Sequence, residues 1–181
     1  MHPLDPLFRP KNAAVIGAMA PGKHGHIVIR HLMKAGFPGG IYPVNPSVGE
    51  VEGLKAYASV SQVPAAIDCA MLVVPAEATL GAVRECAERG VRSIVVGATG
   101  FAELGTDEGR ERQAELVRIA RAAGMRIVGP NTNGIFNASA QFSLGYNTSH
   151  GDPLTPGPVS IAAHSGALFN AVAPQSRPGR A

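Results

Sequence analysis

The sequence predicts an α/β protein in which helices cover both faces of a parallel sheet. Two observations support this prediction. Five short apolar runs alternate with amphipathic segments of helical length, the order of elements in repeated βαβ units. The composition combines 22 glycines with only 5% aromatic residues, which suits close helix–sheet packing and tight turns. Strands that alternate with helices of this length are joined by right-handed crossovers and form a parallel sheet.

Each apolar run has the length of a buried strand and little polar interruption, which is typical of parallel strands covered on both faces. Pro43 in the second run indicates a strand at the edge of the sheet or the end of a strand. The expected strands are Ala13–Gly17, Gly40–Val44, Cys69–Val74, Ser93–Gly97 and Arg126–Gly129. With the helices between them, they predict a Rossmann-like sheet.

Three helices are expected between these strands: His26–Ala35, Glu77–Arg89 and Asp107–Ala123. A glycine follows each of them, as expected where a helix ends in a left-handed residue. In the third helix, Leu116, Val117, Ile119 and Ala120 are expected to face the core, and Arg110, Arg112, Arg118 and Arg121 to face solvent. The segment Val51–Val63 is less regular and predicts a short strand, Leu54–Tyr57, and one helical turn, Ser59–Val63.

The character of the chain changes after Asn137. Residues 138–157 are rich in Ser, Asn, Gly and Pro and predict a linker. Residues 158–163 (PVSIAA) resemble a further strand, and a helix is expected over Ala167–Val172. We therefore expect a Rossmann-like domain over residues 1–137, and over 158–181 the start of a second α/β domain that is truncated.

Composition disfavours several classes of protein. The net charge is +3 and the basic residues are spread along the chain, so a nucleic-acid-binding surface is not expected. Cys69 and Cys86 have no CxxC partner, which disfavours a metal site or a disulfide framework and predicts two buried, reduced thiols. The chain shows neither a signal-peptide pattern nor an apolar run long enough for a membrane span, so we expect a cytoplasmic protein without membrane contact.

A glycine-rich turn follows the first strand and leads into a helix. Free backbone N–H groups and the positive end of the helix dipole meet there, which predicts a phosphate site. Residues 17–23 match G-x-x-x-x-G-K, but His24 stands where a nucleotide triphosphatase loop needs Ser or Thr for Mg²⁺. The phosphate therefore belongs to another ligand.

The residues at the end of the second strand bear on which phosphate-containing ligand binds. An NAD site would have an acidic residue about 20 residues after the glycine-rich turn, to bind the ribose hydroxyls. Here the strand ends in Val44, Asn45 and Pro46. Because no acidic side chain stands at this strand end, a phosphate group on the ribose would not be repelled there. Coenzyme A has one at the 3′ position, and NADP stays the competing dinucleotide.

Three further strands end in loops that we expect at the same edge of the sheet. Val74 and Pro75 offer a flat apolar edge for an adenine, although proline in a first helical turn is also ordinary. Thr99 and Gly100 are small enough for a ligand to lie against the backbone, and Asn131 lies in a polar loop. These loops predict an extended crevice with phosphates at one end.

The runs FRPKNAAVIGAMAPGKHGHIVIRHLMKAGFPGGIYPVNP, VVPAE, GATGFAE and MRIVGPNTNGIFN occur in this order. They resemble the CoA-binding domain of ADP-forming acyl-CoA synthetases, relatives of the succinyl-CoA synthetase α subunit. The resemblance covers residues 7 to 172. It implies a coenzyme A site at the crevice.

The resemblance also implies a role for individual residues. The diphosphate would lie on residues 18–25, namely Ala18, Gly22, Lys23, His24 and Gly25, with Lys23 as the cation. Val44, Asn45 and Pro46 would flank the nucleotide end, and Val74, Pro75 and Glu77 would line the adenine side. Thr99 and Gly100 would lie along the pantetheine arm, and Asn131 would face the thiol.

The family makes ATP reversibly from ADP, phosphate and an acyl-CoA, through an acyl phosphate and a phosphohistidine. The phosphorylated histidine of the family lies beyond residue 181, and no ATP-grasp part matches this sequence. His164 is not at the nucleophile's position, so no catalytic residue is assigned. Ser165 and Gly166 match a helix start that helps to hold the phosphohistidine in the family. We expect binding of CoA or acyl-CoA without turnover.

Several alternatives stay open. The chain can be a truncated ligase or one piece of a split enzyme, with further ligase domains or subunits acting in trans. It can also be a stand-alone NAD(P)- or CoA-binding sensor without catalysis. A homo-oligomer and the identity of the acyl group are likewise left open.

Overall fold

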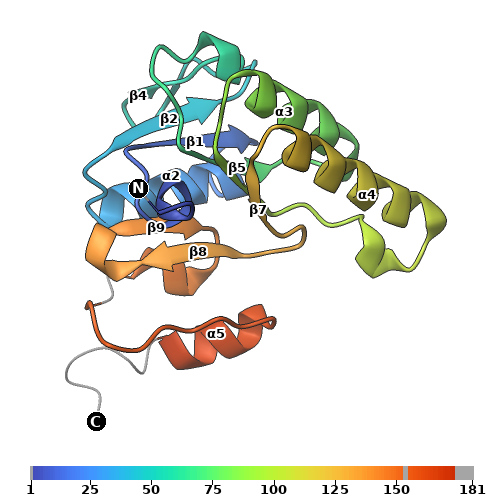
Figure 1. Cartoon of the computed structure of the whole chain (residues 1–181). Coiled ribbons are helices and arrows are strands. Elements are labelled where there is room, and N and C mark those ends of the chain that lie inside the picture. Colours follow the sequence, from blue (N-terminus) through green and yellow to red (C-terminus); the bar gives the residue numbers. More distant parts are fainter. Residues whose placement is uncertain (1, 153–154, 174–181) are drawn as a thin grey trace.

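The computed structural model describes residues 2–152 and 155–173 (Figure 1). Its centre is a five-stranded sheet with the order β2-β1-β5-β6-β7, in which every neighbouring pair is parallel. The strands are β1 (Asn12–Gly17), β2 (Gly40–Val44), β5 (Cys69–Val73), β6 (Ser93–Val96) and β7 (Arg126–Val128). Each lies within one residue of the expected bounds, so the Rossmann-like fold class is confirmed.

The direction in which the sheet grows reverses at β1. From β1 the chain first adds β2 on one side, then crosses back and adds β5, β6 and β7 on the other side. A parallel sheet opens a crevice at the carboxyl ends of its strands where the order reverses, because the two connecting helices leave on opposite faces. Here that point lies between β1 and β5.

Two apolar cores lie on the two faces of the sheet, because alternate strand residues point to opposite sides. On one face, Ala14, Ile16, Leu72 and Val96 pack with side chains of α3 (Ala76–Glu88) and α4 (Asp107–Ala122). On the other, Ala13, Val15, Met71 and Val95 pack with α2 (His24–Lys34) and a β-hairpin. Figure 1 shows α3 and α4 side by side on the right of the sheet and α2 below β1.

The three long helices end where glycine was expected to end them. Gly36, Gly90 and Gly124 have φ angles of +73°, +74° and +65°, a left-handed conformation that side chains with a Cβ adopt rarely. Two smaller elements were expected after β2: the strand forms as β4 (Leu54–Lys55), shorter than expected, and the turn forms as a 3₁₀ turn, η1 (Val60–Gln62). A further strand, β3 (Glu50–Val51), was not expected and pairs with β4 in a short antiparallel hairpin.

The expected linker is partly wrong. Within residues 138–157 lies a strand, β9 (Phe142–Gly145), which pairs antiparallel with β8 (Gly134–Asn137) in a hairpin. Phe142 and Leu144 are fully buried against α2, because alternate residues of β9 point toward it. A four-residue strand with serine and glycine at the other positions gave too weak a pattern to be recognised. The η3 turn (Ala138–Ala140) joins the two strands.

The strand expected over residues 158–163 does not form in the described structure, where Val159 is 78% and Ile161 45% exposed. A strand needs a neighbour for its backbone hydrogen bonds, and residues 2–152 and 155–173 supply none to this segment. The helix that follows does form, as α5 (Gly166–Val172). Its cap is the Ser165 hydroxyl, which accepts from the Leu168 N–H at 3.3 Å.

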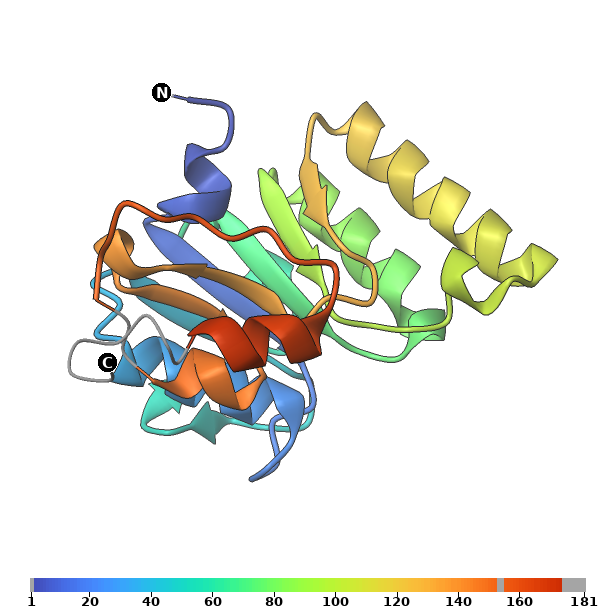
Figure 2. The same ribbon diagram turned by 90° about the horizontal axis from the view of Figure 1, so that it is seen from below.

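The helix α5 lies beyond the β8–β9 hairpin, on the side away from the sheet (Figures 1 and 2). It contacts η4 (Thr148–Gly151), where the Ser149 hydroxyl donates to the Asn170 amide oxygen. The division into two domains therefore stays a prediction, and residues 174–181 of the expected second domain lie outside the described residues. Among the described residues, no helix is both long and apolar enough to cross a bilayer.

Candidate functional site

Five loops follow the carboxyl ends of the five parallel strands, and we call them together the rim. They are residues 18–23, 45–49, 74–75, 97–101 and 129–133. Every residue expected to bind coenzyme A lies in these loops or directly beside them. Because the strands are parallel, all five loops lie at one edge of the sheet.

The first rim loop is held close to both the sheet and α2 by two glycines. Gly17 has a φ of +145°, and a side-chain carbon there would overlap the Val73 carbonyl at the end of β5. A Cβ at Gly25 would lie 2.6 Å from the Ala18 carbonyl oxygen, which instead accepts a hydrogen bond from the Gly25 N–H at 3.1 Å. The loop therefore folds back over the start of α2, and only glycine fits at either place.

The start of α2 presents hydrogen-bond donors and a cation. The first-turn N–H groups of a helix have no acceptors within the helix, and the helix dipole makes this end positive. Lys23 is the N-cap residue and Gly22 before it has a φ of +80°. Lys23 and His24 are exposed. This arrangement can bind a phosphate through the backbone and the lysine together.

The loop after β2 is tied to the loop after β1. The Asn45 side-chain amide donates to the Gly17 carbonyl at 2.7 Å, and its oxygen accepts from the Ser47 N–H at 2.8 Å. Asn45 thus holds two strand ends together at the rim. The Val44 side chain is buried in the core, whereas Pro46 is exposed. Of these three residues, Pro46 presents its side chain to solvent.

The loop after β5 is short and flat. Pro75 is the N-cap residue of α3 and is exposed, and Val74 before it is half-buried. Glu77 lies exposed in the first turn of the helix. The Pro75 carbonyl accepts a hydrogen bond from the Thr79 hydroxyl at 3.0 Å. Val74 and Pro75 therefore present an apolar edge beside the first rim loop, next to Gly17.

The loop after β6 is held by two side chains that the sequence analysis did not assign to the site. Gly100 has a φ of +103°, its N–H donates to the Glu103 carboxylate at 2.7 Å, and its carbonyl accepts from the Arg112 guanidinium. Burial opposes ionisation of Glu103, but backbone hydrogen bonds, first from Gly100, outweigh it and lower the pKa of this carboxyl. Thr99 is exposed beside them.

The position of Arg112 corrects an expectation. It was expected to face solvent, but its side chain is only 14% exposed. Its guanidinium bonds to Gly100 and Glu108 and lies 6.0 Å from the centre of the Phe101 ring. Periodicity placed this residue on the outer face of α4, and a long side chain reaches back from there to the loop.

The loop after β7 folds over the end of β6. Asn131 has a φ of +54°, and its N–H donates to the Ala98 carbonyl at 2.9 Å. A side-chain carbon at Gly129 would overlap the Val96 carbonyl. The Asn131 side chain is exposed at the rim. The loops after β6 and β7 are thus joined through their backbones.

Tyr146 connects three rim loops, although the sequence analysis placed it in a linker. Its ring stacks on His24, and a Cβ at Gly97 would lie 3.0 Å from it. Its hydroxyl donates to the Thr132 carbonyl at 3.0 Å. Burial raises the pKa of this phenol. No local pattern marks Tyr146, because only the fold of the β8–β9 hairpin brings it to the rim.

An acidic residue reaches the first rim loop from the β3–β4 turn. The carboxylate of Glu52 accepts a hydrogen bond from His26 Nε2 at 2.7 Å, and His26 Nδ1 accepts from the Gly22 N–H at 3.4 Å. The His26 side chain is 12% exposed. The sequence analysis looked for an acid at the end of β2 and found none. The β3–β4 hairpin, which follows β2 in the chain, supplies an acidic residue, Glu52.

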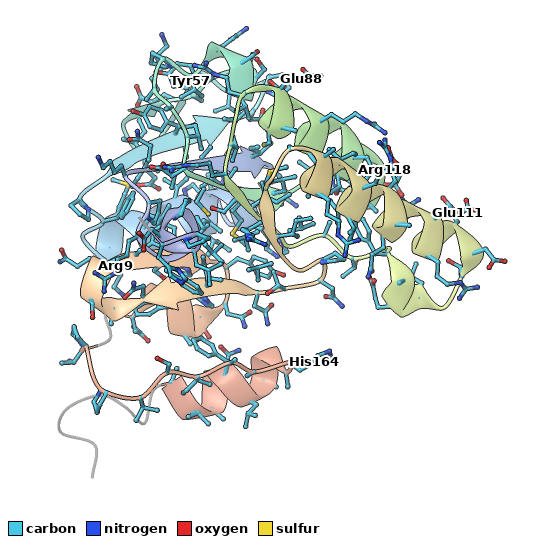
Figure 3. The ribbon with its side chains drawn as sticks, viewed as in Figure 1. Arg9, Tyr57, Glu88, Glu111, Arg118 and His164 are labelled. Carbon is cyan, nitrogen blue, oxygen red and sulfur yellow. The ribbon has the colours of Figure 1, made fainter. Side chains whose placement is uncertain are left out.

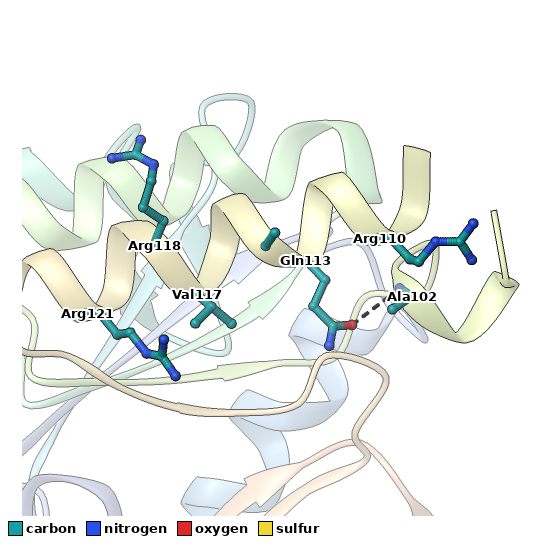
Figure 4. A pocket seen from close by; sticks show the side chains of 7 residues that line it. Ala102, Arg110, Gln113, Val117, Arg118 and Arg121 are labelled. Carbon is teal, nitrogen blue, oxygen red and sulfur yellow. Dashed lines mark hydrogen bonds between the residues drawn. The ribbon is translucent and has the colours of Figure 1, made fainter. Parts of the chain in front are cut away.

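Two surface hollows lie outside the rim. One, of about 510 Å³, follows the outer face of α4 and is lined by Arg110, Gln113, Val117, Arg118 and Arg121 among others (Figure 4). The other, of about 740 Å³, lies between α2 and η4. Val117, expected in the core, is only half-buried at the first hollow. Neither of these two hollows is lined by a residue expected to bind the ligand.

His164 directly precedes Ser165, the N-cap residue of α5. His164 is exposed at the start of α5 and makes no hydrogen bond within the described residues (Figure 3). Within the same residues, no three histidine, cysteine or carboxylate side chains are grouped closely enough to hold a metal ion.

Comparison with known proteins identifies the domain. A family model described as a CoA binding domain matches residues 11–138, well over half of the chain. The chain belongs to this family of CoA-binding domains. All five rim loops fall inside the match, and coenzyme A is the ligand of the domain, as the resemblance implied.

Proteins similar to this CoA-binding domain are larger. The acetate–CoA ligase [ADP-forming] I subunit alpha of Pyrococcus furiosus is 40% identical over 170 residues, which cover 91% of this chain and 36% of that protein. A trans-feruloyl-CoA synthase from an unknown prokaryotic organism is 39% identical over 178 residues, 97% of this chain and 25% of that one. This chain thus spans about a third or less of the length of these relatives.

A solved structure agrees in fold. The dinucleotide forming acetyl-coenzyme A synthetase 1 of Ca. Korarchaeum cryptofilum, in complex with phosphate and ADP, superposes with a TM-score of 0.88 at 39% identity. The superposition covers 96% of this chain and 36% of that chain. The expected family resemblance is therefore confirmed in sequence and in fold.

Proposed function

We propose that the rim binds coenzyme A along the carboxyl edge of the sheet, with the diphosphate on residues 18–25. The observation that supports this placement is the fit of the first rim loop. Gly17 and Gly25 let the backbone fold tightly over the start of α2, where first-turn N–H groups and Lys23 meet. This is the place on the rim where backbone donors, a helix N-terminus and an exposed cation come together.

The rest of the ligand follows the rim from this point. The adenosine end would lie between Pro46 and the apolar edge of Val74 and Pro75, beside Glu77. The pantetheine arm would pass Thr99 and Gly100 toward Asn131. Exposed side chains and glycine backbone line this path, as a long ligand in an open crevice requires. Val44 and Asn45 would act through the backbone and by holding the strand ends.

The chain would supply the CoA site of an ADP-forming acyl-CoA synthetase. The relatives named above support this proposal, since their names describe CoA ligases and a CoA synthase. Acyl transfer would also need the phosphohistidine and nucleotide-binding parts of such an enzyme, in the same polypeptide or in a separate one. The 181 residues alone would bind CoA or acyl-CoA and form no ATP from ADP, phosphate and acetyl-CoA.

A dinucleotide sensor is the second candidate, and the position of Glu52 favours it. An acid near the first loop can bind ribose hydroxyls in NAD sites. Here, however, the Glu52 carboxylate already accepts a hydrogen bond from His26 at 2.7 Å. The two candidates differ in which ligand binds.

Calorimetric titration with CoA, dephospho-CoA, NAD and NADP tests the proposal. We expect a Kd for CoA in the micromolar range, about −8 kcal/mol, and weaker binding of dephospho-CoA. Binding of NAD or NADP without CoA would contradict the proposal and favour the sensor.

A pair of lysine variants places the diphosphate. Lys23→Gln removes the cation at the α2 start, and we expect about tenfold weaker CoA binding. Lys11→Gln removes the same charge from an exposed position before β1, at the opposite edge of the sheet. We expect little change there. Equal effects of both variants would show that only the overall charge matters.

A further inference from the structure

The histidine next to the first rim loop is held in one orientation by two hydrogen bonds. His26 Nδ1 accepts from the Gly22 N–H at 3.4 Å, so in this arrangement the imidazole carries its proton on Nε2. That Nε2–H donates to Glu52 at 2.7 Å. The His26 ring therefore presents a hydrogen-bond acceptor to the loop and a donor to the Glu52 carboxylate.

The turn that presents Glu52 has an unusual backbone. Glu52 has a φ of +51° and Gly53 a φ of +79°, as in the two-residue turns that prefer Asn, Asp or Gly. Glutamate in the left-handed region is disfavoured. The carboxylate nevertheless lies beside the α2 start, where it would repel a phosphate unless a positive charge compensates it.

We propose that His26 couples the binding of the CoA diphosphate to the uptake of a proton. This inference rests on the proposed function. When a phosphate oxygen takes the Gly22 N–H, His26 Nδ1 loses its donor and becomes free to bind a proton from solvent. The imidazolium then donates from Nδ1 to the diphosphate and from Nε2 to Glu52, so each negative group gains a charged partner. No covalent bond changes, and one proton is taken up.

Several other charged and titratable groups lie on the elements around the α2 start within the described residues. The elements that pack around the α2 start contribute Lys23, His24 and Arg30 from α2 and its N-cap, Glu50, Glu52 and Lys55 from the β3–β4 hairpin, and Tyr146 after β9. Glu50 lies opposite Lys55 in the hairpin, and Tyr146 stacks on His24. Glu52 alone of these is hydrogen-bonded to the His26 ring.

In this proposal His26 is a positioning residue, because it acts on the diphosphate through the hydrogen bonds of its ring. Imidazole is the side chain whose charge ordinarily changes between pH 5 and 8. CoA affinity should therefore fall as the pH rises from 6 to 8.5, because the protonated complex becomes harder to form.

Calorimetry in buffers of different ionisation enthalpy measures the protons taken up on binding. We expect uptake of up to one proton by the wild-type chain at pH 7. His26→Gln keeps hydrogen-bonding groups but binds no proton, and we expect it to abolish this uptake and to flatten the pH profile. Its affinity at pH 6.5 should fall about tenfold, and by less at pH 8.5. Glu52→Gln should reduce the uptake and move the fall in affinity to lower pH.

Two controls distinguish proton uptake by His26 from proton uptake by the ligand or by another histidine. Dephospho-CoA lacks the 3′-phosphate monoester, so an uptake that persists with it belongs to the protein. His2→Gln is a matched variant, because His2 Nδ1 also accepts a backbone N–H, from Leu4 at 3.2 Å, at an exposed site beside Asp5. It should leave the uptake unchanged.

The outcomes distinguish this inference from the function on which it rests. CoA binding with equal proton uptake in the wild type and His26→Gln would overturn the role of His26 and leave the CoA site in place. Absence of CoA binding by the wild type would overturn the proposed site and this inference with it.

Discussion

The ring of Tyr146 stacks on the imidazole of His24, with centroids 4.4 Å apart and planes inclined by 18°. This contact joins the first residue of α2, directly after the glycine-rich loop, to the residue that follows the β8–β9 hairpin, 122 positions further along the chain. Tyr146 also contacts Gly97 after β6 and the Thr132 carbonyl after β7. The shape of the proposed CoA site therefore depends on a segment that carries no binding motif of its own.

Removing the Tyr146 ring should weaken CoA binding. Tyr146→Ala removes the ring that stacks on His24. We expect about tenfold lower affinity for CoA, because the residues at the start of α2 lose this packing contact. Tyr146→Phe keeps the stack and loses only the hydrogen bond to Thr132, so its affinity should stay within about threefold of wild type. Titration calorimetry measures both. Wild-type affinity in Tyr146→Ala would show that the stack plays no part in binding.

Gly25 should not tolerate a methyl group. Gly25→Ala places a Cβ 2.6 Å from the Ala18 carbonyl and 2.9 Å from Met19 Sδ, so the first rim loop must shift. We expect a loss of about 1–3 kcal/mol in unfolding free energy and weaker CoA binding. Urea unfolding and calorimetry measure the two effects.

Gly81 provides the matched control for Gly25. It lies on the exposed side of α3 with no atom within 4 Å of an added Cβ. Gly81→Ala should stabilise the chain by about 0.5–1 kcal/mol, because alanine loses less backbone entropy in a helix. Similar stability changes at both positions would argue against the close packing at Gly25.

Arg112 should contribute to stability, unlike its neighbour Arg110. Arg112→Met leaves the Gly100 carbonyl without its guanidinium donor, and we expect a loss of about 1–2 kcal/mol and weaker CoA binding. Arg110 pairs with Asp107 on the surface and its side chain is 55% exposed, so Arg110→Met should change stability by less than about 0.5 kcal/mol. Chemical denaturation compares the two. Equal losses would show that burial of Arg112 is unimportant.

The buried histidine near α5 should make the protein sensitive to acid. His150 is 3% exposed, and burial, with a further effect of His31, lowers its pKa to about 4. Its Nδ1 has no hydrogen-bond partner in the described structure. A histidine with a lowered folded pKa stabilises the fold above its unfolded pKa of 6.5 and loses that contribution as the pH falls toward 4.

His150→Phe tests this pH dependence. The phenyl ring keeps the contact with Phe169, whose centroid lies 5.2 Å from that of His150. Between pH 6.5 and 4 the wild type should lose up to about 3 kcal/mol more unfolding free energy than the variant. Thermal and urea unfolding at several pH values measure the difference. Parallel pH profiles would mean that His150 is solvated in solution.

Both thiols should be unreactive in the folded chain. Burial raises the pKa of Cys69 and of Cys86 to about 12, so almost no thiolate is present near neutral pH. A chromogenic disulfide reagent at pH 8 should detect no thiol in the native protein and two after denaturation. Rapid labelling of the native chain would contradict the burial of these side chains.

The succession of strands and helices was readable from the sequence, because each depends on local periodicity. Apolar runs of five or six residues marked β1, β2 and β5 within one residue, and the glycines after α2, α3 and α4 take the left-handed conformation that ends a helix. The rim loops were also located, since parallel strands place all their carboxyl ends at one edge. The precise role of each rim residue in CoA binding stays a prediction.

Contacts between distant segments were decided only in the tertiary structure. Tyr146 at the rim, Glu52 beside His26 and Arg112 on the Gly100 carbonyl come from a hairpin, a turn and a helix whose local patterns say nothing of their neighbours. The β8–β9 hairpin forms because Phe142 and Leu144 find an apolar surface on α2, far away in the chain. Sequence periodicity thus determined which elements form. The packing of side chains between elements decided where the β8–β9 hairpin, Arg112 and Glu52 contact the rim.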